Sequence, residues 1–300
     1  MTHPLRTRCF TEGGRLLRRN WAAAIITAAC LLGSVSSVFA DYIEPSAVNV
    51  KTERYIPAKS DFERGTYFYK VSWQGIPVAE ARVVVDDEQL GDRPALKVKA
   101  SAQTGDFIDI FYKLRFTSES VFDAHSFQPA RFYSLQRENS REKFREVSFS
   151  DDGVIQANYI KNGKDREPRE FRSENATFDP ISAAFLARSL PLDMGAKKEF
   201  DVFNGKHRFL ISFDIAAREV IEVRGRKYDA IKVYPTVQKL TDSEGEQRLK
   251  YAAIWISADD NREVLKLESK VLVGTVDAEL VRFEPEVTAP RPVEVARASK

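Results

Sequence analysis

The segment FDPISAAFLARSLP, residues 178–191, brings together residue types that could do chemistry. Asp179, Ser182 and Arg188 are close in sequence, and a serine with a base and an acid nearby can act as a nucleophile. Ser182 is not in a G-x-S-x-G elbow, and no Ser-x-x-Lys pattern begins at it. The available bases are His125 in DAHSFQP and His207 after NGK, both in turn-like sequence. We therefore predict no catalytic residue.

The same segment has the pattern of a short helix that packs. Asp179 is a good N-cap, and Pro180 suits the first helical position, where its missing N–H is not needed. Apolar residues follow at helical spacing, and Pro191 prevents the helix from continuing. We expect one covering helix at about 179–189, with Asp179 and Pro180 in a structural capping role. Replacing Ser182 by alanine should then be nearly silent.

The sequence predicts neither a metal nor a cofactor. Its two cysteines, Cys9 and Cys30, lie in the first 40 residues, and His125 and His207 alone cannot make a conventional structural zinc site. The acidic turns lack the spaced oxygens of a calcium loop, and no glycine-rich phosphate loop leads into a helix. No basic stripe alternates with aromatic residues, so we expect no nucleic-acid partner.

The first 40 residues read as a secretory signal peptide. Five arginines precede the small, apolar run WAAAIITAACLLGSVSSV, and VFA ends at Ala40. A retained membrane anchor is the alternative, but the apolar run is short for a span of roughly 20 residues. Cleavage after Ala40 leaves 260 of the 300 residues and changes the net charge from +2 to −2, because the signal carries five Arg and one Glu. We expect a mature protein that does not span the membrane and is periplasmic.

The rest of the chain is dominated by a two-residue period. It begins at Gly65 with TYFYKVSW and persists to TVDAELVRF, interrupted by turns such as DDG and KNGK. About a dozen long strands in sequence imply a mainly β fold: a large, curved antiparallel sheet, or incomplete barrel, with one dry face. We expect an N-terminal arm at 41–61, a single β-rich domain at 62–283, and a disordered, proline-rich tail at 284–300.

Two aromatic-rich segments are candidates for contact with a ligand, the predicted helix at 179–189 and residues 105–116. The segment GDFIDIFYKLRF (105–116) breaks the β period and could form a short helical lid, although an ordinary core role explains it as well. The ligand-lining candidates are Phe107, Ile108, Phe111, Tyr112, Phe185 and Arg188.

The mixed-charge run QRENSREKFRE (136–146) is interpreted as a solvent-exposed hairpin.

Four segments resemble one family of exported bacterial proteins. They are WQGIPVAEARV, FDPISAAFLAR, GRKYDAIKV and WISADDNREVLKLESKVLVGTVDAELV, in this order over residues 62–283. Together they are similar to domain-of-unknown-function family 3108. The resemblance implies no activity and no catalytic residues. Its pattern is similar to the periplasmic lipoprotein-carrier fold, an incomplete barrel whose apolar concave face is covered by helices, which is an analogy of fold alone.

These observations leave three functions open. The first is a non-enzymatic binding or carrier protein for an apolar ligand such as a lipid or acyl chain. The second is a structural or assembly protein of the cell envelope, with envelope partners and a sheet interior filled by its own side chains. The third, a hydrolase, lacks a credible base. Inward apolar residues look alike whether they pack on each other or on a lipid, so the pattern does not separate the first two.

We predict cleavage between Ala40 and Asp41, because VFA follows the apolar run directly. Intact-mass measurement of protein from the envelope fraction should give a chain that starts at Asp41. A mass that retains Cys30, or a lipid adduct on it, would contradict a freely periplasmic protein.

Overall fold

The computed structural model describes residues 51–165, 168–240, 251–271 and 274–286. Within them the chain forms sixteen strands and two helices. The predicted signal peptide lies outside the described residues. The strands are β1 (Gly65–Trp73), β2 (Ile76–Leu90), β3 (Arg93–Thr104), β4 (Leu114–Asp123), β5 (Pro129–Glu138), β6 (Arg141–Phe149), β7 (Val154–Lys161), β8 (Lys164–Asp165), β9 (Arg169–Arg172), β10 (Thr177–Phe178), β11 (Lys197–Phe203), β12 (Arg208–Val223), β13 (Arg226–Lys239), β14 (Ala252–Ser257), β15 (Val264–Lys270) and β16 (Thr275–Pro285), and the helices are α2 (Asp106–Asp109) and α3 (Pro180–Ser189).

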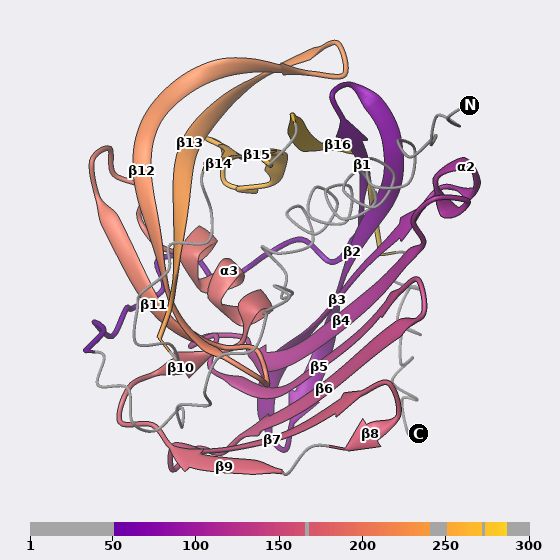
Figure 1. The fold of residues 1–300 in the computed structure, drawn as a ribbon. Helices are drawn as coiled ribbons and strands as arrows, with labels where there is room; N and C mark the ends of the chain where they lie inside the picture. Colours follow the sequence, from indigo (N-terminus) through magenta and orange to yellow (C-terminus); the bar gives the residue numbers. More distant parts are fainter. Residues whose placement is uncertain (1–50, 166–167, 241–250, 272–273, 287–300) are drawn as a thin grey trace, which may run out of the picture.

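All sixteen strands belong to one curved sheet that stops short of closing (Figure 1). The order runs β10 to β16, then β1 to β8, and β9 pairs with β7 beside β8. Because β16 pairs with β1, the last strand adjoins the first. The two open edges, β8 with β9 on one side and β10 on the other, are formed by consecutive parts of the chain. The predicted incomplete antiparallel barrel is confirmed, with one short parallel pair, β10 and β11.

The turns follow from residues that tolerate positive φ. Gln74 and Gly75 join β1 to β2 with φ values of 50° and 79°, and Arg224 and Gly225 join β12 to β13 with 52° and 79°. Two successive residues of positive φ make the type I′ turn, whose twist matches that of the flanking strands. The strands β1 and β2 therefore form an antiparallel hairpin.

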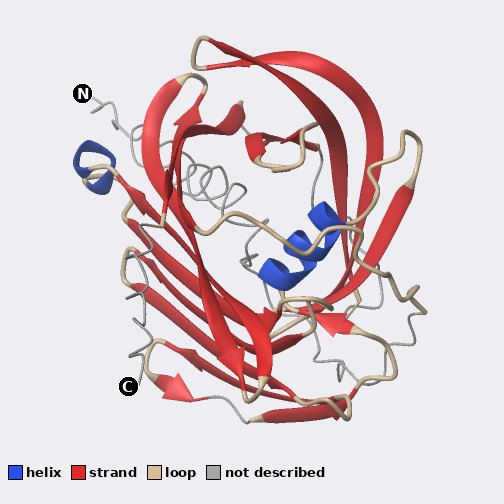
Figure 2. Cartoon of the chain, turned by 180° about the vertical axis from the view of Figure 1, so that it is seen from behind, coloured by secondary structure: helices blue, strands red, loops and turns tan. Residues whose placement is uncertain are grey.

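Helix α3 begins where the sheet breaks and lies in its concavity (Figures 1 and 2). Its N-cap is Asp179, as predicted, with Pro180 in the first turn. One carboxylate oxygen of Asp179 accepts hydrogen bonds from the backbone N–H groups of Ile181 (2.7 Å) and Ser182 (3.1 Å). The other accepts from Ser120 Oγ of β4 at 2.6 Å, so the same side chain ends the helix and fixes it to the sheet.

Ser182 completes this cap from inside the helix. Its hydroxyl oxygen accepts the backbone N–H of Asp179 at 3.1 Å, which makes a reciprocal capping box. Both side chains are fully buried. Burial raises the pKa of Asp179, and the hydrogen bonds from Ser120 and Ser182 oppose this rise. Because its hydroxyl takes part in the cap, we now expect Ser182→Ala to destabilise the protein, in contrast to the expectation from the sequence.

A group of phenylalanine rings packs α3 against the sheet and the N-terminal arm. Phe185 of α3 lies 5.1 Å from Phe62 and 5.5 Å from Phe122, between ring centroids. The arm also donates two backbone hydrogen bonds, from Ala58 and Lys59, to the carbonyl of Ser189. The segment before β1 is thus packed across the C-terminal end of α3.

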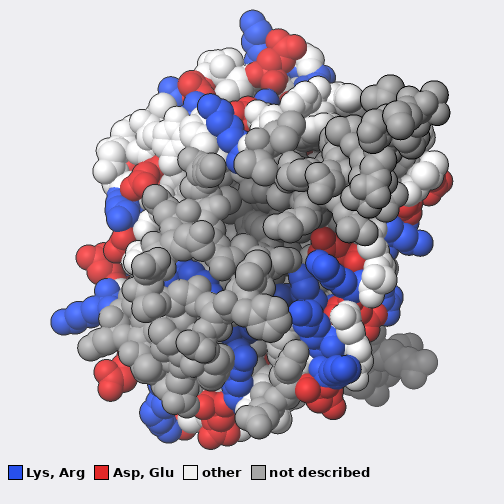
Figure 3. Space-filling model, in the orientation of Figure 1, with Lys and Arg blue, Asp and Glu red and all other residues white. Residues whose placement is uncertain are grey.

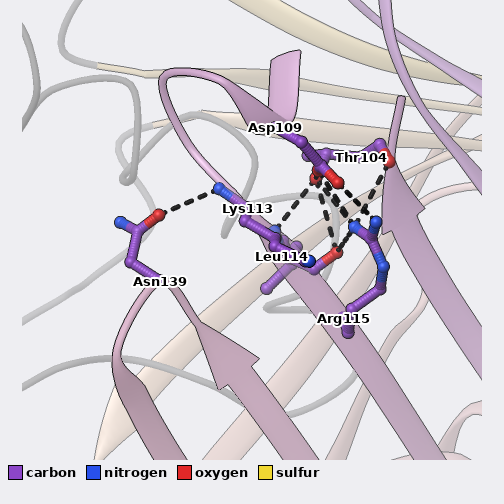
Figure 4. Close-up of polar contacts among 6 residues, drawn as sticks. All are labelled: Thr104, Asp109, Lys113, Leu114, Arg115 and Asn139. Atoms are coloured by element: carbon purple, nitrogen blue, oxygen red, sulfur yellow. Dashed lines mark hydrogen bonds and ion pairs between the residues drawn. The ribbon is translucent and has the colours of Figure 1, made fainter. Parts of the chain in front are cut away.

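Helix α2 lies at the tip of the β3–β4 hairpin, apart from α3 in both views (Figures 1 and 2). It is held there by polar contacts (Figure 4). The Arg115 guanidinium makes a two-pronged ion pair with Asp109, whose carboxylate also accepts from Thr104 Oγ1. This pair lowers the pKa of Asp109. The tie is intact at neutral pH and is lost as pH falls through the lowered value, because protonation removes the charge that Arg115 binds.

The β5–β6 hairpin, predicted to be exposed to solvent, is buried on one face. The strands form as expected over the mixed-charge run, but Gln136, Glu138, Lys143 and Arg145 are buried on the concave side. Strand alternation places these four on one face and leaves Arg137 and Glu142 outside. The charge-rich composition of this hairpin therefore does not predict that one of its faces is buried.

β16 runs to Pro285, two residues past the predicted domain end. The domain limits and the disordered tail stay predictions. Among the described residues, no helix is long and apolar enough to cross a membrane.

Asp179→Ala should lower the free energy of unfolding by about 2–3 kcal/mol, because it leaves a buried hydroxyl and two backbone N–H groups without their acceptor. Asp179→Asn should cost less than half as much, since asparagine is an equally good N-cap. Ser182→Ala should cost about 1 kcal/mol. Denaturant unfolding followed by circular dichroism measures all three, and equal losses for the two Asp179 variants would disprove the capping role.

Arg115→Met should loosen α2, because it removes the ion pair that holds Asp109 (Figure 4). We expect faster amide hydrogen exchange over residues 108–112, with the rest of the sheet unchanged. The matched control is Arg137→Met, which removes an exposed ion pair with Glu142 on the next hairpin. Equal exchange in wild type and Arg115→Met would show that packing alone holds this helix.

Candidate functional site

A cavity of ≈ 210 Å³ lies between α3 and the concave face of the sheet. Its wall on the sheet side follows the two-residue period: every second residue of β1, β2 and β3 faces it. These residues are Tyr67, Tyr69 and Val71 of β1, Ala79, Ala81, Val83 and Val85 of β2, and Val98, Ala100 and Ala102 of β3. The dry face predicted from alternation is thus the lining of this cavity, called here the α3 cavity.

The opposite wall comes from α3 and the later strands. Those strands contribute only apolar side chains apart from Asn204, which is buried just after β11. The residues are Val202, Asn204, Phe209, Ile211, Phe213, Val237, Ile254, Val264, Leu267 and Ala278, and those of α3 are Pro180, Ile181, Ala183, Ala184, Phe185 and Arg188. The α3 cavity is therefore an apolar chamber with few polar side chains.

Small residues on two neighbouring strands leave this space open. Ala81 pairs with Ala102, and Val83 pairs with Ala100, so short side chains lie opposite one another on β2 and β3. Ala81 and Ala102 are half-buried although they point inward. A core of this size normally fills such a position with a larger side chain, because protein interiors pack to near-crystalline density. The alanines are the sequence feature that makes the cavity.

Arg188 is the charged side chain of the cavity lining that faces inward. Arg82 also borders the cavity, but it lies between the inward-facing Ala81 and Val83 and is exposed, so its side chain is on the outer face. Arg188 lies on the same face of α3 as Ala184 and Ile181, at a spacing of four and seven residues. The chamber thus has one cationic point near the C-terminal end of α3.

The position of Arg188 is fixed by aromatic rings and by a backbone contact. Its guanidinium lies 4.7 Å from the centroid of Phe62 and 5.0 Å from that of Phe185. Its Nε donates to the carbonyl of Arg262 at 2.8 Å, and Arg262 Nη1 returns hydrogen bonds to the carbonyls of Arg188 and Leu190. Burial lowers the pKa of Arg188, although a guanidinium remains charged in proteins.

Of the six residues predicted to line a ligand, the structure brings together two. Phe185 and Arg188 border the α3 cavity. Phe107 and Phe111 are 72% and 54% exposed on α2, away from the cavity. Ile108 and Tyr112 do not border the cavity, but they are buried in an apolar cluster that shares Val71, Ala79, Leu114 and Ala278 with its lining. The reason is geometric, since α2 has only four residues and sits beyond the ends of β3 and β4 rather than over their concave face.

Part of the concave face outside the α3 cavity is polar. Ser118, Ser134, Gln136 and Arg145 are buried on β4, β5 and β6, and Lys and Arg side chains gather over this side of the molecule (Figure 3). Desolvation and, after it, the charges of the neighbouring cations, first among them Arg145, together lower the pKa of Lys206 to about 8. The sheet therefore has a concave face that is apolar around α3 and cationic beyond it.

The described residues hold no group of three or more His, Cys, Asp or Glu side chains placed to bind a metal ion. Ser182, the one serine considered as a nucleophile, is fully buried and its hydroxyl is engaged in the helix cap. No catalytic function is indicated by this arrangement.

Comparison with solved structures finds similar folds at low sequence identity. A beta-barrel-like protein of domain of unknown function DUF1849 from Brucella abortus is 10% identical, with a TM-score of 0.48, over 79% of this chain and 100% of that chain. The hypothetical lipoprotein YmcC from Escherichia coli is 9% identical, with a TM-score of 0.29, over 74% and 89% of the two chains. No curated protein matches the sequence. Residues 69–281 match a family described as protein of unknown function (DUF3108), and the chain belongs to that family.

Proposed function

We propose that this protein is an exported, non-enzymatic binding or carrier protein that holds an apolar, lipid-like ligand in the α3 cavity. The observation that carries the proposal is the cavity itself, apolar on nearly all sides and kept open by facing alanines on β2 and β3. Binding sites for apolar ligands are concave and mostly hydrophobic, with few polar groups. The arginine-rich start and apolar run of the sequence support export to the periplasm, where envelope proteins are the expected partners.

The competing function is a structural or assembly protein of the envelope whose interior is filled by its own side chains. The phenylalanine cluster around Phe185 favours it locally, because that part of the interior is densely packed. The alanine pairs on β2 and β3 favour the carrier, because larger side chains would be expected where the sheet needs only to be filled.

Protein purified natively from the periplasmic fraction should release an apolar molecule on solvent extraction, detectable by lipid mass spectrometry at close to one per chain. The control is the same preparation after denaturation, delipidation and refolding, which should release none. A native preparation with no apolar molecule, and a refolded one that takes up none, would favour the structural alternative.

Filling the cavity should abolish uptake. The double variant Ala81→Leu, Ala102→Leu adds volume to the wall, so we expect the neutral fluorescent probe N-phenyl-1-naphthylamine to bind about tenfold or more weakly. Ala216→Leu is the matched control, because Ala216 is exposed on β12 outside the cavity lining. Melting temperatures of both variants show whether the sheet is intact, and unchanged probe affinity in a folded double variant would place any apolar site elsewhere.

A further inference from the structure

We infer that the α3 cavity takes an amphiphile with a single aliphatic chain and an anionic head group, and that Arg188 binds the head group. This inference rests on the proposed function and names the chemical class of the ligand. It starts from a contradiction within the site: a chamber built from apolar side chains contains a permanent positive charge.

Arg188 has no carboxylate partner among the described residues. Its contacts are the two phenylalanine rings and the carbonyl of Arg262, which engages Nε only. The two Nη groups, which carry the paired donors suited to a carboxylate or a phosphate, keep no hydrogen-bond partner there. Arg188 is half-buried among apolar side chains. A charge partly removed from water without a counterion is costly, so an anion supplied by a ligand would stabilise this arrangement.

The ionisable groups around Arg188 are also compatible with an anionic head group there. The groups around it that could carry a negative charge are Tyr69, Tyr67 and Glu263. Burial raises the pKa of both tyrosines, that of Tyr67 to about 12, so their hydroxyls stay neutral at neutral pH. The hydroxyl of Tyr67 donates to the carbonyl of Glu63 at 3.5 Å. Glu263 makes no ion pair with Arg188, and burial together with Asp259 and Glu63 raises its pKa, which reduces its competition for the guanidinium.

The remaining lining sets the position of the chain. Ile181 and Ala184 lie on the same face of α3 as Arg188, and seven residues of helix cover about 10 Å. The alanine pairs of β2 and β3 lie across the cavity from this face. A head group on Arg188 would therefore direct an aliphatic chain along α3 toward its N-terminal end, over walls that are apolar apart from Asn204 and the tyrosine hydroxyls.

Competition against N-phenyl-1-naphthylamine tests the head-group preference with four probes at neutral pH. Laurate has the chain and the charge, 1-dodecanol has the chain alone, and acetate and inorganic phosphate have the charge alone. We expect laurate to compete about tenfold or more strongly than dodecanol, because a charge-assisted contact is gained, and the two small anions not to compete. Equal competition by laurate and dodecanol in the wild type would overturn the inference and leave the proposed function standing.

Variants assign the preference to a residue. Arg188→Met should reduce the laurate preference to near onefold and leave dodecanol affinity within about twofold, and Arg188→Lys should keep part of it. Arg218→Met is the control, since Arg218 pairs with Asp229 on the surface. A preference that survives in folded Arg188→Met, or that is lost in Arg82→Met instead, overturns the assignment. If neither the neutral probe nor any amphiphile binds the wild type, the proposed function fails and this inference fails with it.

Discussion

One carboxylate, that of Asp179, joins the helix to the sheet, and the rest of the interior depends on this junction. A sheet that stops short of closing leaves an apolar concave face, and only α3 among the described elements lies inside it. The carboxylate ends the helix with one oxygen and binds Ser120 of β4 with the other. Because each oxygen has its own partners, the cap forms in full only when the start of α3 lies beside Ser120 of β4. The local signal that starts the helix thereby also sets its depth in the molecule.

The sequence predicts most of the fold because the signals that specify it are local. Alternation specifies strands such as β3, and the pattern of Asp179, Pro180 and Pro191 specifies α3 almost to the residue. The incomplete closure is also implied, since one short helix between strands must occupy part of the interior. What could not be predicted is which buried face is polar. Arg145 and Gln136 lie in a charge-rich hairpin whose inner face is dry only because the sheet curves over it.

Only part of the candidate site could be predicted from the sequence, because only some of its residues lie in segments with a clear local pattern. Phe185 and Arg188 are on the helix whose pattern is plain, so their place in the cavity follows once the helix is inside the sheet. Phe107 and Phe111 were grouped with them on aromatic density alone, which does not say whether a segment lies over a sheet or beyond its end. The alanines lie in the alternating strands, but an alanine alone does not predict a cavity. It does so only when the residue paired with it on the neighbouring strand is also small. That condition is set by register, as in the pair of Ala81 and Ala102.

Both ends of α3 are tied down, which bears on how the cavity could be reached. At its start the helix is held by Ser120, and at its end by the reciprocal contacts of Arg188 and Arg262 and by the arm at Ala58. Lifting the helix would break these hydrogen bonds together and separate the phenylalanine rings, whereas rotating side chains along the wall breaks none of them. The helix is therefore better regarded as a fixed wall than as a lid. Arg188 takes part in that wall through Nε, and its side chain also borders the cavity, so one side chain can hold the helix in place and meet a ligand without exchanging one role for the other.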